Sequence, residues 1–241
     1  MPWSRWMPSP YWMNSLHKTV VIAHRGFHRD FPENTLESFK AAVDLGVDGV
    51  EFDVQETADA GFVIHHDADI DRHSIGSLSL ADLASYRVGG SYRVPTLQEA
   101  LNILGRGLVL LVELKQVRSL EKFLVILRSY VDKAWTVLVS FDAALIERLA
   151  VLAPELPRAV ISEPGDKAGA VASTGTAGFT QVAAENITHE LVKDAHARGD
   201  LVFVWDGGDE ETLRRAVRCG LDVIMTDRPD AVIGELRKLQ T

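Results

Sequence analysis

The chain has 241 residues, 46% of them apolar, and its 34 acidic side chains outnumber 25 lysines and arginines to give a net charge of −9. This charge, without a Lys/Arg-rich segment, argues against nucleic-acid binding, because phosphate backbones require clustered positive charge. No uninterrupted apolar run approaches the roughly 18 residues of a membrane-spanning helix. The single cysteine, Cys219, excludes an intramolecular disulfide. We expect a cytoplasmic protein without a transmembrane segment.

Residues 1–18 form a segment rich in tryptophan and proline, with Trp3, Trp6 and Trp12 among them. The segment lacks the long apolar core of a secretory signal. Three interpretations remain open: a disordered extension, an aromatic anchor that contacts a membrane surface or covers the active site, and a segment docked on the body of the protein. We expect an N-terminal extension followed by one domain, residues 19–241.

From Thr19 onward, short apolar runs rich in β-branched residues alternate with segments of helical periodicity. This alternation is typical of successive βα units around a parallel sheet. The length of the chain is that of one such barrel. The sequence therefore predicts a single-domain (β/α)8 TIM barrel. The predicted strands are 20–23, 49–54, 108–114, 137–141, 159–162, 178–184, 201–205 and 223–226, with an additional short strand, 62–65, after the second.

Two helix starts carry capping signals. Asn34 lies three residues before Glu37 and predicts a capping box for the first helix. Asp227 precedes Pro229 and predicts a cap for the last helix.

Polar and charged side chains gather where the predicted strands end. In a barrel of this kind, the carboxyl ends of all strands face one rim, and active sites are built on that rim. We therefore expect these side chains to converge. They are His24, Arg25, Glu51, Asp53, Glu113, Lys115, Trp205, Thr226 and Asp227.

The acidic residues among them share a face. Successive side chains of a strand alternate sides, so Glu51 and Asp53 project together, and Glu113 and Lys115 do the same on another strand. Buried carboxylates are costly unless they are paired, protonated or bound to a cation. One interpretation is an ion-pair network, with Asp53 paired to Arg25 and Glu113 to Lys115. The other is an oxygen-ligand site for a hard cation, Mg²⁺ or Ca²⁺.

Histidines end two of the predicted strands. His24 follows 20–23, and His65 and His66 close the short strand at 62–65. An imidazole both accepts and donates a proton near neutral pH, which suits acid/base chemistry. Strand alternation directs only one of His65 and His66 into the pocket. The chain has no phosphate-binding loop, dinucleotide fingerprint or nucleophile elbow, which disfavours nucleotide-driven chemistry and serine-triad hydrolysis.

The motifs of the chain resemble those of the glycerophosphodiester phosphodiesterases. The resemblance runs from about residue 20 to the C-terminus, and the combination of H-R-G, P-E-N-T, E-x-D and H-D makes it specific. The motifs, in chain order, are AHRGFHRDFPENTLESF, GVDGVEFDVQETADAGFVIHHDADIDR, VPTLQEAL, LVELK, VSFD, VWDGG and LDVIMTDRPD.

The resemblance implies a metal-dependent hydrolase of lipid and glycerol metabolism that converts glycerophosphodiesters to glycerol 3-phosphate and an alcohol. It implies Glu51, Asp53 and Glu113 as ligands of Mg²⁺ or Ca²⁺. It also implies His24 and His66 as the acid/base pair, and His66 is preferred to His65 because Asp67 follows it. The same resemblance implies that Arg25 and Lys115 contact the phosphate and that Trp205 packs beside the glycerol. Which histidine is the acid, and whether the nucleophile is water or the 2-hydroxyl of the substrate, stay open.

Two other functions are alternatives on the same fold. A lysophospholipase-D-like enzyme or a cyclising phosphodiester lyase is favoured by the tryptophan-rich N-terminal segment. A non-catalytic phosphodiester-binding barrel is disfavoured, because every charged position of the motifs is present. The expected partner is a small-molecule glycerophosphodiester rather than a nucleic acid, and the sequence carries no signal for an oligomeric state.

Overall fold

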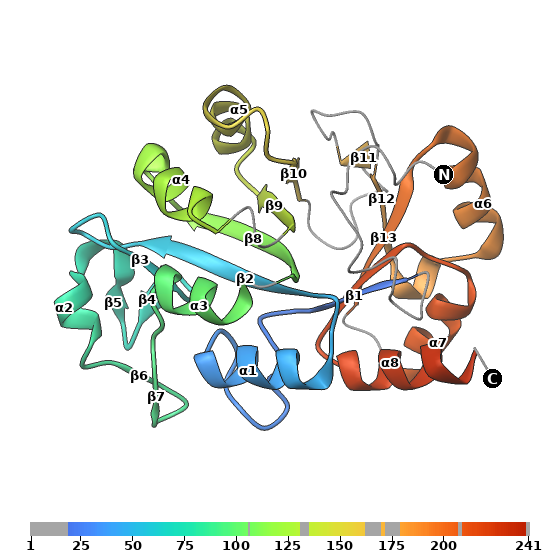
Figure 1. The fold of residues 1–241 in the computed structure, drawn as a ribbon, viewed down its shortest axis with the longest axis horizontal. Coiled ribbons are helices and arrows are strands. Elements are labelled where there is room, and N and C mark those ends of the chain that lie inside the picture. The colour runs from blue at the N-terminus through green and yellow to red at the C-terminus, as the bar shows by residue number, and fades with distance from the viewer. Residues whose placement is uncertain are drawn as a thin grey trace.

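The computed structural model describes residues 19–105, 107–130, 135–161, 170–171, 179–206 and 209–239. The predicted N-terminal extension, residues 1–18, lies outside the described residues. Within the described ranges, eight parallel strands form a curled sheet with helices on its outer side, which is the predicted (β/α)8 arrangement in a single domain (Figure 1). No pairing joins β10 to β12, the two ends of this parallel sheet, within those ranges.

The strand order of the sheet places the chain's first strand at its centre. The parallel strands in spatial order are β10 (Arg158–Val160), β9 (Trp135–Ser140), β8 (Val109–Gln116), β2 (Gly49–Glu56), β1 (Val20–Ala23), β14 (Val223–Thr226), β13 (Leu201–Asp206) and β12 (Phe179–Ala183). Two short antiparallel strands join the sheet, β3 (Phe62–Ile64) on β2 and β11 (Ala170–Val171) on β12. The first and last strands of the chain, β1 and β14, therefore lie side by side.

The predicted strands are confirmed in place, with ends that differ from the prediction by at most two residues. Two of these differences lengthen strands at the rim. β2 continues to Glu56 because its last residues pair with β3. β8 continues to Gln116, where it still pairs with β2 beyond a register shift at Val54 and Gln55. These extensions carry both strands above the apolar interior and toward the rim.

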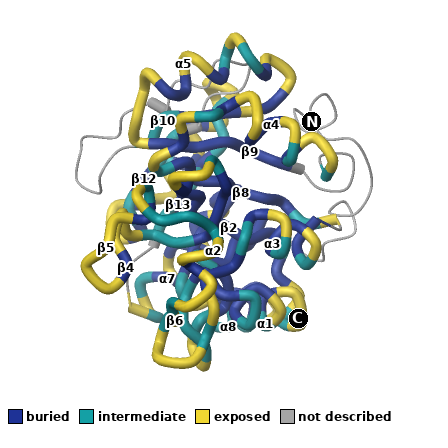
Figure 2. The backbone as a smooth tube through the Cα atoms, turned by 90° about the vertical axis from the view of Figure 1, so that its left-hand side faces the viewer, coloured by how far each residue is buried: buried dark blue, intermediate teal, exposed yellow. Residues whose placement is uncertain are grey.

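The helices other than the short α2 cover the outer face of the sheet, and each buries an apolar stripe. Figure 2 shows the strands buried at the centre, with exposed residues along the outward sides of the helices. Among the described helices, none is long and apolar enough to cross a membrane. The helices are α1 (Leu36–Leu45), α2 (Leu80–Leu83), α3 (Leu97–Leu104), α4 (Leu120–Arg128), α5 (Ala143–Leu152), α6 (His189–Arg198), α7 (Glu210–Arg218) and α8 (Pro229–Lys238).

Strand alternation divides the core into two parts. In β1, Val21 and Ala23 pack in the large cluster between strands and helices, whereas Val20 and Ile22 pack in a smaller cluster inside the barrel. The interior cluster is completed by side chains of β8, β9, β10 and β14, and Trp205 packs against it. The next inward position of β1 after Ile22 is His24, so the apolar interior forms the floor beneath the polar rim.

Both predicted helix caps are wrong. The N-cap of α1 is Thr35, whose hydroxyl accepts from the backbone N–H of Ser38. Asn34 instead binds a side chain of β2. The N-cap of α8 is Arg228, which makes no side-chain capping bond in the described structure, and Asp227 instead binds imidazoles.

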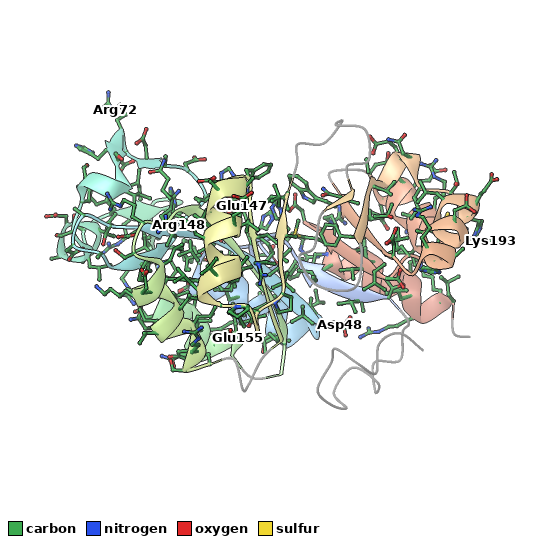
Figure 3. The ribbon with its side chains drawn as sticks, turned by 90° about the horizontal axis from the view of Figure 1, so that it is seen from above. Asp48, Arg72, Glu147, Arg148, Glu155 and Lys193 are labelled. Atoms are coloured by element: carbon green, nitrogen blue, oxygen red, sulfur yellow. The ribbon has the colours of Figure 1, made fainter. Side chains whose placement is uncertain are left out.

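The segment after β3 forms two short hairpins beside the barrel. It comprises β4 (Asp69–Ile70), β5 (His73–Ser74), β6 (Arg87–Val88) and β7 (Tyr92–Arg93) together with α2. A separate apolar cluster that includes Ile75 and Leu83 holds it together. In the view from above, Arg72 of the β4–β5 turn projects at the end of the molecule opposite to Lys193 of α6 (Figure 3).

The turn after β1 depends on Gly26. Its φ of +83° is the left-handed conformation that residues with a Cβ avoid. A Cβ at this position would lie 2.5 Å from the Ser38 hydroxyl oxygen and 2.8 Å from the Ser38 carbonyl carbon. Glycine therefore permits the loop that carries His24 and Arg25 to lie directly on the start of α1.

We predict that Gly26→Ala lowers the free energy of unfolding by about 2–4 kcal/mol, because backbone strain and a clash with the Ser38 backbone act together. Gly199→Ala is the matched control, since Gly199 has a φ of +84° but a Cβ added there would meet nothing within 4 Å. The control should lose only about 1–2 kcal/mol from backbone strain. Urea unfolding measures both variants, and equal losses would show that the contact with Ser38 is unimportant.

Candidate active site

The rim of the barrel carries three carboxylates on adjacent strands. Asp53 of β2 is paired in register with Glu113 of β8, and Glu51 lies one inward position below Asp53. All three face the interior side, because their neighbours Phe52 and Val112 pack in the outer core. The parallel register therefore converts two sequence-distant motifs into one cluster.

These carboxylates are buried and close together. Their exposed fractions are 2% for Glu51, 0% for Asp53 and 8% for Glu113. One ligand oxygen from each lies within 4.8 Å of the others. Burial, followed by the negative charges of Asp53 and Glu113, raises the pKa of Glu51 well above its usual value. Burial and Asp53 raise the pKa of Glu113 as well.

Two cations stand against the cluster, and both contact Asp53. The Nε atom of Arg25 lies 3.2 Å from Oδ2 of Asp53, and Nζ of Lys115 lies 3.2 Å from Oδ1. Lys115 also lies 2.5 Å from Oε1 of Glu113. These three contacts are ion pairs. The predicted pairing of Asp53 with Arg25 and of Glu113 with Lys115 is therefore present.

Arg25 has two acidic partners besides Asp53. Its Nη1 donates to Oε1 of Glu33 at 2.7 Å, and its backbone N–H donates to Oε2 of Glu51 at 3.0 Å. Burial works against the charge of Arg25, but Asp53 and Glu33 outweigh it and raise the pKa of the guanidinium. Lys115 and Arg25 consequently stay charged beside a cluster whose acidic groups outnumber them.

The ion pairs leave one carboxylate oxygen without a partner. Among the described residues, nothing donates a hydrogen bond to the buried Oε1 of Glu51. A buried carboxylate oxygen of this kind is costly unless it binds a cation or is protonated. The donor set consists of oxygens alone, which suits a hard divalent cation rather than zinc. Glu51, Asp53 and Glu113 could therefore hold such an ion.

Asn34 holds Asp53 in place from the other side. Its amide nitrogen donates to Oδ2 of Asp53 at 2.8 Å, and its amide oxygen accepts from the Asp53 backbone at 3.4 Å. Asn34 has a φ of +55°, a conformation that asparagine tolerates better than most residues. Its side chain thereby binds β2 and does not cap α1.

His24 lies between the carboxylate cluster and a fourth carboxylate. Its Nδ1 is 2.7 Å from Oδ1 of Asp227, and its Nε2 is 3.8 Å from Oε2 of Glu51. The edge of its ring meets Trp205 of β13, with ring centroids 5.8 Å apart. Burial opposes ionisation of Asp227, but hydrogen bonds from His24 and His28 overcome it and hold the pKa of Asp227 far below its usual range. Asp227 therefore fixes the ring of His24 with a full negative charge.

A second imidazole shares the same carboxylate oxygen. Nε2 of His28, in the loop after Gly26, lies 3.1 Å from Oδ1 of Asp227. This hydrogen bond raises the pKa of His28 above its usual value. His24, His28 and Asp227 form the second group of ligand atoms within 4.8 Å of one another in the described part of the chain.

His66, in the loop after β3, is more exposed than His24, with side-chain fractions of 37% and 11%. Its Nδ1 is 2.8 Å from Oδ1 of Asp67. Gln55 of β2 holds this loop by donating to the backbone carbonyls of His66 and Asp67 at 3.1 and 3.0 Å. Burial lowers the pKa of His65, which keeps that imidazole neutral.

Comparison with known proteins assigns this site to a family. The sequence model of the glycerophosphoryl diester phosphodiesterase family matches residues 24–231, which include every rim residue described above. The chain belongs to this family. It is a phosphodiesterase, an enzyme that hydrolyses glycerophosphodiesters.

Relatives of this phosphodiesterase match along nearly their whole length. A glycerophosphodiester phosphodiesterase of Caldanaerobacter subterraneus subsp. tengcongensis is 30% identical over 92% of this chain and 99% of its own. The crystal structure of a glycerophosphodiester phosphodiesterase from Agrobacterium tumefaciens superposes with a TM-score of 0.77 at 26% identity, over 90% of this chain and 99% of its own. The structure of an Oleispira antarctica phosphodiesterase, in complex with the product sn-glycerol-3-phosphate, superposes with a TM-score of 0.75 at 26% identity. The match covers 90% of this chain and 96% of that chain.

Sequence reasoning found the charged centre of the phosphodiesterase but missed the residues that hold it. The predicted residues Glu51, Asp53, Glu113, His24, Arg25, Lys115 and Trp205 come together on the rim. His66 lies in the loop after β3, which Gln55 of β2 holds. The residues missed are His28, Glu33, Asn34 and Gln55, although Glu33 and Asn34 lie in the P-E-N-T motif. Asp227 is expected among the rim side chains, but its contact with His24 is not.

We predict that Glu51→Gln stabilises the metal-free phosphodiesterase at alkaline pH. Because the pKa of Glu51 is raised in the fold, the native state binds its proton more tightly than the unfolded chain, so stability falls as pH rises above the ordinary value of 4.5. In EDTA at pH 8, the variant should melt about 2–4 °C above the wild type. The difference should shrink at pH 5.

Differential scanning calorimetry measures this effect. Glu147→Gln, at an exposed position of α5 (Figure 3), is the control and should leave the melting temperature unchanged. A wild type at least as stable as Glu51→Gln in EDTA at pH 8 would contradict the repulsion between these carboxylates.

Proposed function

We propose that this phosphodiesterase cleaves glycerophosphodiesters to glycerol 3-phosphate and an alcohol with His24 and His66 as the acid/base pair and a divalent cation on the carboxylate cluster. The observation that carries the proposal is the unpartnered oxygen of buried Glu51, whose other oxygen lies 3.8 Å from the imidazole of the His24–Asp227 pair. An ion-pair network alone would leave that oxygen without a function.

The cation would be held by Glu51, Asp53 and Glu113, and their all-oxygen donor set favours Mg²⁺ or Ca²⁺. When bound, such an ion offsets the negative charge that grows on the phosphoryl oxygens. Arg25 and Lys115 supply the same electrostatic stabilisation from the protein itself, since both stay charged at the edge of the cluster. Asn34 and Glu33 orient the groups around them.

His24 and His66 are equipped in the same way for proton transfer. Each directs Nδ1 at a carboxylate, so the Nδ1 proton is donated to Asp227 or Asp67 and Nε2 is left to exchange a proton with the substrate. One imidazole deprotonates the nucleophile and the other protonates the departing alkoxide, and each contributes about 10²–10⁴-fold. The nucleophile is water or the neighbouring 2-hydroxyl of the substrate.

The glycerol end of the substrate is assigned to the side of Trp205. Its ring contacts His24 and packs on the apolar floor, which gives a flat wall beside the proton-transfer group. The related Oleispira antarctica enzyme binds sn-glycerol-3-phosphate, which supports a glycerophosphate-binding rim on this fold.

Phosphorus NMR tests this function directly. The protein is incubated with glycerophosphocholine, glycerophosphoethanolamine or lysophosphatidylcholine, in Mg²⁺, Ca²⁺ or EDTA. We expect glycerol 3-phosphate from the soluble diesters with a divalent cation, and loss of turnover in EDTA and in Glu51→Gln. Turnover in EDTA would refute the role of the cation. Accumulation of cyclic phosphate, or cleavage of lysophosphatidylcholine alone, would indicate the lyase or lysophospholipase-D alternative, and no turnover a binding barrel.

We predict that His66→Ala lowers kcat at least a hundredfold, because one of the two proton transfers is lost. The melting temperature should stay nearly unchanged, since the His66 side chain is partly exposed. His73→Ala is the control, because His73 is exposed in the β4–β5 hairpin. Steady-state kinetics on glycerophosphocholine measures both, and a wild-type rate in His66→Ala would remove His66 from the mechanism.

A further inference from the structure

His24, His28 and Asp227 offer a second set of metal ligands beside the carboxylate cluster. Nδ1 of His24 and Nε2 of His28 lie 2.7 and 3.1 Å from the same oxygen of Asp227. Their ligand atoms lie within 4.8 Å of one another. The two histidines come from the loop after β1, and Asp227 follows the neighbouring strand β14. The adjacency of the first and last strands of the barrel therefore assembles the set.

The chemistry of this set differs from that of the carboxylate cluster. Two imidazoles and one carboxylate are the ligands of many zinc sites, in which water takes the fourth position. Ligands at about 2.0–2.2 Å from zinc in a tetrahedron lie about 3.4 Å apart, so an ion would require side-chain shifts below about 1 Å. Mg²⁺ and Ca²⁺ prefer oxygen ligands and would stay on Glu51, Asp53 and Glu113.

Solvent reaches the set through Asp227. The exposed side-chain fractions are 11% for His24, 23% for His28 and 48% for Asp227. An ion can thus approach the half-exposed carboxylate and enter between the two rings. The ring nitrogens that face the ion are those that now donate to Asp227, so a metal ion would replace two protons between the same three atoms.

We propose that His24, His28 and Asp227 form an inhibitory site for Zn²⁺ or a similar imidazole-binding divalent ion. Inhibition, but not binding, rests on the proposed role of His24. With the ion on Nδ1, the remaining proton of the neutral His24 ring resides on Nε2. That ring has no lone pair left to accept a proton, and its hydrogen bond to Asp227 is lost. His24 then cannot cycle a proton with the substrate while the carboxylate cluster stays intact.

The simpler interpretation is that Asp227 only accepts two hydrogen bonds. Zinc affinity distinguishes a metal site from a shared hydrogen-bond acceptor, because an acceptor alone has no more affinity for zinc than any other His–Asp pair. His196 and Asp222 provide such a pair, with Nε2 2.7 Å from Oδ2. In the described part of the chain, no third ligand joins them. His196→Gln is therefore the matched control.

Binding is measured first, without reference to activity. Glu51→Gln serves as the background, because it removes one of the three carboxylates of the cluster. Zn²⁺ is titrated calorimetrically, and Co²⁺ is followed by its visible absorption. We expect about one equivalent of each metal and a four-coordinate Co²⁺ spectrum. Adding His28→Gln should abolish both signals, because glutamine keeps a donor toward Asp227 but not the imidazole. Adding His196→Gln should change neither, and failure of the Glu51→Gln protein to bind either metal would overturn the proposal.

Inhibition is measured next on the otherwise wild-type protein with glycerophosphocholine at saturating Mg²⁺ or Ca²⁺ and constant pH. The zinc concentration for half-inhibition should rise about tenfold or more in His28→Gln and stay unchanged in His196→Gln. Circular dichroism checks folding, with His28→Asn as the replacement if His28→Gln misfolds. Equal inhibition of the wild type and His28→Gln would overturn the inhibitory site. Zinc binding without inhibition would instead refute the proton-transfer role of His24.

Discussion

The mutual repulsion of three buried carboxylates is the constraint around which this barrel is arranged. Glu51, Asp53 and Glu113 lose hydration at the rim, and their negative charges raise the pKa of Glu51 and Glu113. Arg25, Lys115 and Asn34 offset part of this cost at Asp53. Glu51 keeps an oxygen without a donor among the described residues. A site that was only structural would be more stable with that oxygen paired or the carboxylate replaced.

The barrel concentrates this charge because each strand separates two environments. Outward positions of β1, β2 and β8 pack against helices. Inward positions of β1 and β8 form part of an apolar floor, which gives way to polar groups at the strand ends. Parallel pairing then places residues at the same level of neighbouring strands next to each other, as with Asp53 and Glu113. The turn at Gly26 adds the loop that carries Arg25 against α1. The fold thereby supplies rigid support for a centre that is electrostatically unfavourable in itself.

His24 connects the two halves of the rim. One ring nitrogen faces Glu51 and the other faces Asp227, so the same imidazole stands beside an oxygen-only ligand set and within a mixed nitrogen and oxygen set. The first set suits the hard cation of the proposed reaction, and the second suits a borderline ion that would block it. The two neighbouring sites would then select different metals by their ligand atoms, oxygen alone in one and nitrogen with oxygen in the other.

The sequence by itself determined the strands, the barrel and the charged centre, because period-two alternation and strand-end polarity are local properties of the chain. Glu51 and Asp53 share a face whatever the rest of the fold does. Only the tertiary structure decided the partners of Asn34 and Asp227, which local rules assign to helix caps. Asn34 reaches Asp53 across 19 residues, and Asp227 reaches His24 across 203. A hydrogen bond to a charged group at close range stabilises these side chains more than a helix N-terminus does. The charged partners come within reach only when β1, β2 and β14 pack together.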